Sequence, residues 1–108
     1  MPSTGEVNTP AHTPNSLTLS ASVAELQPLR YTPAGLPALD VMLEHASVQR
    51  EAGGERQAVL RLKAVAFGTQ AERLGRQALE SLWIFQGFLA QGRNGKGVVF
   101  HIQQFQPQ

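Results

Sequence analysis

Cationic side chains gather at three places in this sequence, and at two of them an aromatic side chain lies nearby, a combination typical of a surface that binds anions and flat rings. Guanidinium and ammonium groups neutralise phosphates, and an exposed aromatic ring offers a flat surface on which another ring can stack. The candidate binding residues are Arg30, Tyr31, Arg61, Lys63, Phe67, Arg93 and Lys96. This chemistry holds a ligand but breaks no bond in it.

The residue types that most catalytic sites require are missing or isolated. The 108 residues include no cysteine, which excludes disulfides, thiolate metal sites and a cysteine nucleophile. His12, His45 and His101 have no acid or second histidine at metal-ligand spacing on a shared helix. The glycines at 92–97 lack the Gly-Lys-Ser/Thr ending of a phosphate loop, and no serine has a nucleophile-elbow context. We therefore expect a protein that is not an enzyme and uses no metal or cofactor.

The near-neutral net charge of +1 conceals an uneven distribution. Residues 1–55 hold two bases and six acids, a formal charge of −4, whereas residues 56–108 hold seven bases and two acids, a formal charge of +5. Solvation of two opposite faces is one explanation, and an anion-binding surface in the C-terminal half is the other.

The start of the chain predicts neither a signal peptide nor a membrane anchor. It lacks a basic segment followed by an apolar block, and no run approaches the roughly 18 apolar residues that span a membrane. Residues 1–14 combine three prolines with small polar residues, which predicts a disordered tail. We expect residues 15–108 to form one domain and the protein to be cytoplasmic.

Apolar residues alternate with polar ones in three segments, a pattern typical of strands with one buried face. The segments are 17–24, 39–48 and 59–67. In the last of them, the alternation places Arg61, Lys63 and Phe67 together on the outer face.

After residue 67 the spacing of apolar residues changes from that of a strand to that of a helix. Thr69 and Glu72 fit a capping box and predict a helix of roughly ten residues. Strands follow at 82–90 and 98–105, the second with Val99, His101 and Phe105 on one face.

Segment 82–90 is apolar throughout, with Gln86 as its one polar marker. An outward Gln86 places Trp83, Phe85, Gly87 and Leu89 inside. The opposite set forms an exposed apolar stripe, which is the candidate dimer or partner surface: Leu82, Ile84 and Phe88.

The resulting order is three strands, a short helix and two strands. This is the order of an all-β OB-fold, a five-stranded Greek-key barrel with a short helix between its third and fourth strands. OB-folds bind oligonucleotides on their second and third strands and on the first and fourth loops, the regions that hold the seven candidate residues. Cations with few aromatics indicate single-stranded nucleic acid bound without sequence preference and with strong salt dependence.

Four segments resemble one bacterial family, primosomal replication protein N or PriB. They are TPAGLP at 32–37, VMLEHASVQREAG at 41–53, RQAV at 56–59 and QGFLAQ at 86–91. The resemblance covers about residues 15–105 and matches Arg30, Arg93 and Lys96. It departs at Gly54 and Val59, where some family members carry aromatics.

The resemblance implies an OB-fold homodimer that binds single-stranded DNA and helps to restart stalled replication forks. It also implies that the protein stabilises the PriA helicase on DNA and helps to recruit later primosome components such as DnaT. The alternative is an OB-fold protein–protein adaptor with little DNA binding, which the missing aromatics favour.

Overall fold

The alternating segments form long strands in the computed structural model, which describes residues 13–108. The elements in chain order are β1 (Leu17–Leu26), β2 (Arg30–Tyr31), β3 (Pro37–Glu51), β4 (Gly54–Phe67), α1 (Thr69–Gly75), β5 (Leu82–Gln91) and β6 (Val98–Pro107). The prediction of a disordered tail falls almost entirely outside the described residues and stays a prediction.

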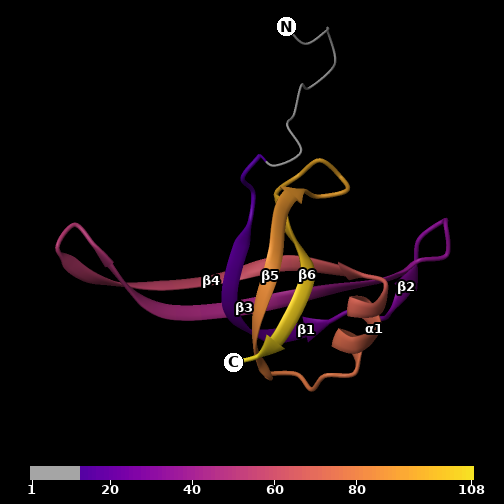
Figure 1. The fold of residues 1–108 in the computed structure, drawn as a ribbon, viewed down its shortest axis with the longest axis horizontal. Helices are drawn as coiled ribbons and strands as arrows, with labels where there is room; N and C mark the ends of the chain where they lie inside the picture. Colours follow the sequence, from indigo (N-terminus) through magenta and orange to yellow (C-terminus); the bar gives the residue numbers. More distant parts are fainter. Residues whose placement is uncertain (1–12) are drawn as a thin grey trace, which may run out of the picture.

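The strands close into a barrel (Figure 1). Their order is β1-β5-β6-β4-β3-β2, and β1 also pairs with β3. Every pairing is antiparallel except that of β4 with β6, which is parallel and sets Val65 opposite His101. Five long strands with one helix between β4 and β5 confirm the predicted OB-fold, and the two-residue β2 is an addition at the edge.

The core lies between the inner faces that the alternation predicted. Val23, Leu43, Phe85 and Phe100 are fully buried there. The helix α1 covers one end of the barrel and buries Ala71 and Leu74 against this core. Burial of apolar area drives this packing. The sequence has no cysteine, so no disulfide supports the core.

The hairpin of β3 and β4 is longer than the segments predicted at 39–48 and 59–67. Pairing continues from Ala38 opposite Phe67 to Glu51 opposite Gly54. Ala52 and Gly53 both have positive φ, 52° and 82°, as a two-residue primed turn requires. Residues 46–59 extend beyond the barrel, and we call them the hairpin arm (Figure 1).

The predicted capping box is wrong. Helix α1 is seven residues long, its N-cap is Gly68, and no side chain caps it. Thr69 is already the first helical residue, and the N–H of Glu72 donates to the Gly68 carbonyl over 3.2 Å. Gly68 has φ 66°, a conformation that glycine tolerates and that turns β4 directly into the helix.

A β-bulge reverses one predicted face of β6. Gln86 pairs with Gln104 and Gly87 with Ile102, so Gln103 is an extra residue. An extra residue reverses the alternation beyond it. Phe105, predicted to share a face with His101, therefore points into the core and is 4% exposed.

The predicted faces of β5 are correct in part. Phe85 and Gly87 are buried and Gln86 is exposed, as expected. Leu89 was expected inside but is 38% exposed. The Asn15 side chain bonds both the N–H and the carbonyl of Leu89, so a polar residue lies against this end of the strand.

A bidentate ion pair fixes β2 against β3. The Nε and Nη2 of Arg30 lie 2.6 and 3.1 Å from the two carboxylate oxygens of Asp40. These hydrogen bonds lower the pKa of Asp40, although partial burial opposes the shift, and the charges of Arg30 and Arg93 lower it further. The same pair raises the pKa of Arg30.

Gly87→Ala should destabilise the barrel. A Cβ at position 87 would lie 1.8 Å from the carbonyl oxygen of His101, so β5 and β6 would have to separate. We expect the free energy of unfolding in urea to fall by about 3 kcal/mol. Gly54→Ala is the control, because its nearest atom would be 3.9 Å away. Equal stability of the two variants would contradict this packing.

Asp40→Asn should reduce stability at pH 7 by about 1 kcal/mol, the upper end for partly exposed ion pairs. A lowered native pKa means that the ionised carboxylate stabilises the fold above its unfolded value of about 3.9 and that this contribution is lost as pH falls through the native pKa. The urea unfolding free energies of wild type and variant should therefore begin to converge below about pH 4 and become equal only below the lowered native pKa. Glu55→Gln, which removes a far more exposed pair with Arg50, should change little at either pH. A constant Asp40→Asn deficit between pH 7 and pH 3 would contradict the ion-pair explanation.

Candidate nucleic-acid interface

A groove of about 1000 Å³ lies over the outer face of β4. The segment that leads from β1 into β2 forms one wall, and the loop between β5 and β6 forms the other. The predicted binding residues that line it are Arg30, Lys63, Phe67, Arg93 and Lys96. Five of the seven predicted residues, far apart in the sequence, thus meet at one place.

Three cations of the groove are available to a ligand. Lys63, Arg93 and Lys96 form no ion pair with any residue in the range 13–108. Arg30 also lines the groove, but its pair with Asp40 cancels its charge. The positive character of the groove therefore comes from one side chain on β4 and two on the β5–β6 loop.

Hydrogen bonds hold the β5–β6 loop in a defined turn. The N–H of Gly92 donates to the Gly97 carbonyl and the N–H of Gly95 to the Gly92 carbonyl, over 3.1 and 2.9 Å. The Asn94 side chain accepts from the N–H of Lys96, and the Gln91 side chain donates to the Gly95 carbonyl. Gly95 and Gly97 have positive φ, which lets the loop turn tightly and places its cations at the groove.

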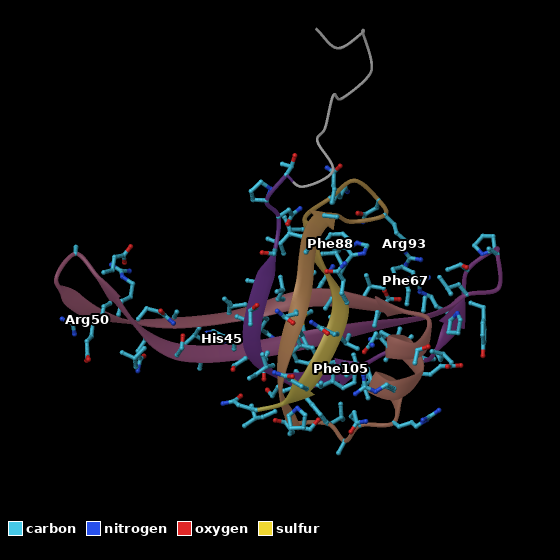
Figure 2. The ribbon with its side chains drawn as sticks, viewed as in Figure 1. His45, Arg50, Phe67, Phe88, Arg93 and Phe105 are labelled. Carbon is cyan, nitrogen blue, oxygen red and sulfur yellow. The ribbon has the colours of Figure 1, made fainter. Side chains whose placement is uncertain are left out.

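Three rings form a row beside these cations. His101 stacks on Phe88 with ring centroids 4.7 Å apart and on Phe67 with centroids 5.9 Å apart. Phe88 lies directly opposite His101 on β5, and the parallel pairing of β6 with β4 brings Phe67 to the other side. Phe67 and His101 line the groove, and Figure 2 shows Phe67, Phe88 and Arg93 gathered below the loop.

His101 was not among the predicted binding residues, because alternation identifies its face but not the strand that lies beside it. Phe88 lies on the outer face of β5 as predicted, but it is half-buried and stacks on His101, and its place in a partner surface stays a prediction. Of the three predicted partner-surface residues, only Leu82 is largely exposed, at 60%, and Ile84 is half-buried.

Two predicted binding residues lie outside the groove. Tyr31 is 64% exposed on β2 and does not line it. Arg61 is on the outer face of β4 as expected, but it pairs with Glu25 over 3.0 Å and with Glu44 over 3.2 Å. Ion pairs between residues so distant in the sequence leave no signal in an alternation pattern.

The described residues contain neither a metal-ligand cluster nor a membrane-spanning helix. Within residues 13–108, no group of three or more His, Asp and Glu side chains could hold a metal ion. No helix in that range is long and apolar enough to cross a membrane. What the arrangement can do is hold anionic groups and flat rings side by side.

Comparisons with known proteins identify the family of this chain. A family model described as "Another single-strand binding protein family" matches residues 15–104. Replication restart protein PriB of Bordetella pertussis is 45% identical over 91 residues, which cover 83% of this chain and 85% of that protein. The PriB of Neisseria meningitidis serogroup B is 40% identical over 78 residues, covering 71% and 76%.

Solved structures resemble the barrel as well. PriB of Ralstonia solanacearum superimposes with a TM-score of 0.81 at 35% identity, covering 88% of this chain and 98% of that one. The single-stranded DNA binding protein of Thermus aquaticus gives a TM-score of 0.68 at 26% identity, covering 87% of this chain and half of that one. The sequence match over most of both chains and the shared barrel together show that this chain belongs to the PriB family of OB-fold proteins.

Proposed function

We propose that this protein binds single-stranded DNA in the groove over β4 and acts in replication restart. The observation that carries the proposal is the convergence of three unpaired cations, Lys63, Arg93 and Lys96, with a row of three stacked rings. Membership of a family whose relatives are named replication restart proteins supports it.

The chemistry of the groove favours single-stranded DNA of any sequence. Phosphates fit beside the cations, and an exposed base can stack on Phe67 at the end of the ring row, since every base has a flat face. A paired duplex keeps its bases stacked inside and cannot use the rings in this way. No step in this function requires bond making, so we propose binding and not catalysis.

We further propose that the bound protein stabilises the PriA helicase on DNA and helps to recruit DnaT. This finer role rests on the family resemblance. The alternative, a protein–protein adaptor with little DNA binding, is favoured by one observation: Arg30 and Arg61 are paired with acids, and Tyr31 lies away from the groove.

We also propose a homodimer formed through the outer face of the β1–β5–β6 sheet. Gln86 hydrogen-bonds Gln104 and Thr18 across this face, and neither Ile84 nor Leu82 is charged. A face without charges that includes an exposed leucine suits contact with a second copy, because interface cores are depleted of charge.

Light scattering at micromolar protein concentration should give twice the chain mass of 11.7 kDa. Leu82→Glu together with Ile84→Glu should shift the mass to that of the monomer, because each dimer would otherwise bury four carboxylates without partners. Glu substitution at Val48, an equally exposed residue on the hairpin arm, is the control and should leave the dimer intact. A monomeric wild type would contradict the dimer.

Lys63→Ala combined with Arg93→Ala should weaken binding of a dT oligonucleotide by about tenfold at 0.1 M salt, since two phosphate contacts are lost. Fluorescence anisotropy over a salt series should show a slope of log affinity against log salt that is shallower by about 0.7 for each cation removed. The matched control is Arg50→Ala with Arg56→Ala, which removes the same charge from the far end of the hairpin arm, in ion pairs with Glu55 and Glu51.

Equal losses in the two double variants would show that only net charge matters and that the groove is not the site. If the wild type binds no oligonucleotide at low salt but co-elutes with the helicase, the adaptor alternative holds.

A further inference from the structure

Three charged side chains from three strands converge beside the groove. Arg61 on β4 lies directly opposite Glu44 on β3, and its Nε is 3.2 Å from a Glu44 carboxylate oxygen. Its Nη2 is 3.0 Å from a carboxylate oxygen of Glu25 on β1. Two acids around one base leave a formal charge of −1, and each side chain is about half exposed, so the cluster meets an approaching ligand.

The cluster lies between the groove and the hairpin arm on one continuous face. Lys63, two residues from Arg61 on β4, lines the groove, and so does Glu25. In the other direction, Val59 and Val48 on the arm are 73% and 60% exposed. A strand of DNA that left the groove along β3 and β4 would have to pass over the cluster to reach the arm.

Phosphates are repelled at this point, although it contains an arginine. A phosphate approaching Arg61 must displace a carboxylate that already binds the guanidinium, and the displaced carboxylate stays nearby as a like charge. Lys63 imposes no such cost, because no residue in the described range pairs with it.

We propose that Glu25 and Glu44 withhold Arg61 from the DNA and so set the boundary of the interface. The strand is confined to the groove between Lys63 and the β5–β6 loop, and the hairpin arm stays free of it. This inference rests on the proposed binding of single-stranded DNA.

Glu25→Gln combined with Glu44→Gln should release Arg61 and strengthen binding. Both changes keep the size of the side chain and remove its charge. We expect affinity for a dT oligonucleotide to rise about tenfold at 0.1 M salt and the salt slope to steepen by about 0.7, the value for one additional phosphate contact on a single strand. Titration with oligonucleotides of increasing length should also show a longer occluded site.

The matched control removes two carboxylates from the arm, Glu51→Gln with Glu55→Gln. These acids hold Arg56 and Arg50 in the same kind of exposed pair but at the distal end of the hairpin. The change in net charge is identical, and at 0.1 M salt its effect is largely screened beyond about 10 Å. We expect little change in affinity, salt slope or site length.

Arg61→Ala, made in the Glu25→Gln, Glu44→Gln variant and in the wild type, tests whether Arg61 itself contacts a phosphate or whether only the change in net charge matters. In the Glu25→Gln, Glu44→Gln background, it should remove the added salt slope. In the wild type, it should leave the slope unchanged, since Arg61 makes no phosphate contact there. Thermal unfolding of each variant checks that the barrel is intact.

Equal gains in the groove-side and arm-side double variants would overturn the boundary, as would a wild-type Arg61→Ala slope as shallow as that of Lys63→Ala. In either case, binding by the wild type would leave the proposed function standing. Failure of the wild type to bind any oligonucleotide at low salt would overturn both.

Discussion

The parallel pairing of β6 with β4 is the constraint on which the interface depends. It sets Val65 opposite His101 and thereby brings two distant parts of the sequence to one face. The rings of Phe67 and His101 meet there, with Phe88 behind them on β5. The same pairing places the loop that joins β5 to β6 beside Lys63, at the same groove. Without this pairing, Lys63 and Phe67 on β4 would be separated from the rings and loop cations of the β5–β6 hairpin.

Carboxylates already occupy two of the assembled cations. Asp40 occupies Arg30 with two hydrogen bonds, and Glu25 and Glu44 occupy Arg61. The uneven charge distribution of the chain thus has a local consequence, because acids from the N-terminal half lie against bases on both sides of the groove. Lys63 and the two loop cations remain available. A count of basic residues would overestimate the number of cations without an acid partner. The net charge of +1 would give no sign of a positively charged groove.

The sequence pattern, which comprises the strand-like segments, the change to a helix after the third strand and the positions of the cations, was enough to predict the barrel, the chain order of its long strands and five of the residues that line the groove. It failed where one residue or one distant partner changes the outcome. The extra Gln103 reverses the face of Phe105, and Gly68 replaces the expected side-chain cap of the helix. Arg61 was assigned to the correct face, but its ion pairs were not predicted, because the acids come from two other strands. Pairing between distant strands created the ring row, so His101 carried no signal of its own.

The groove can be tested most directly with an amide chemical-shift map recorded while the protein is titrated with a dT oligonucleotide. We expect shifts that cluster at Lys63, Phe67, His101 and the loop residues 92–97, with the tip of the hairpin arm at 50–56 unaffected. Shifts concentrated on the arm, or shifts absent from both the loop and the ring row, would contradict the central claim that the groove over β4 is the DNA interface.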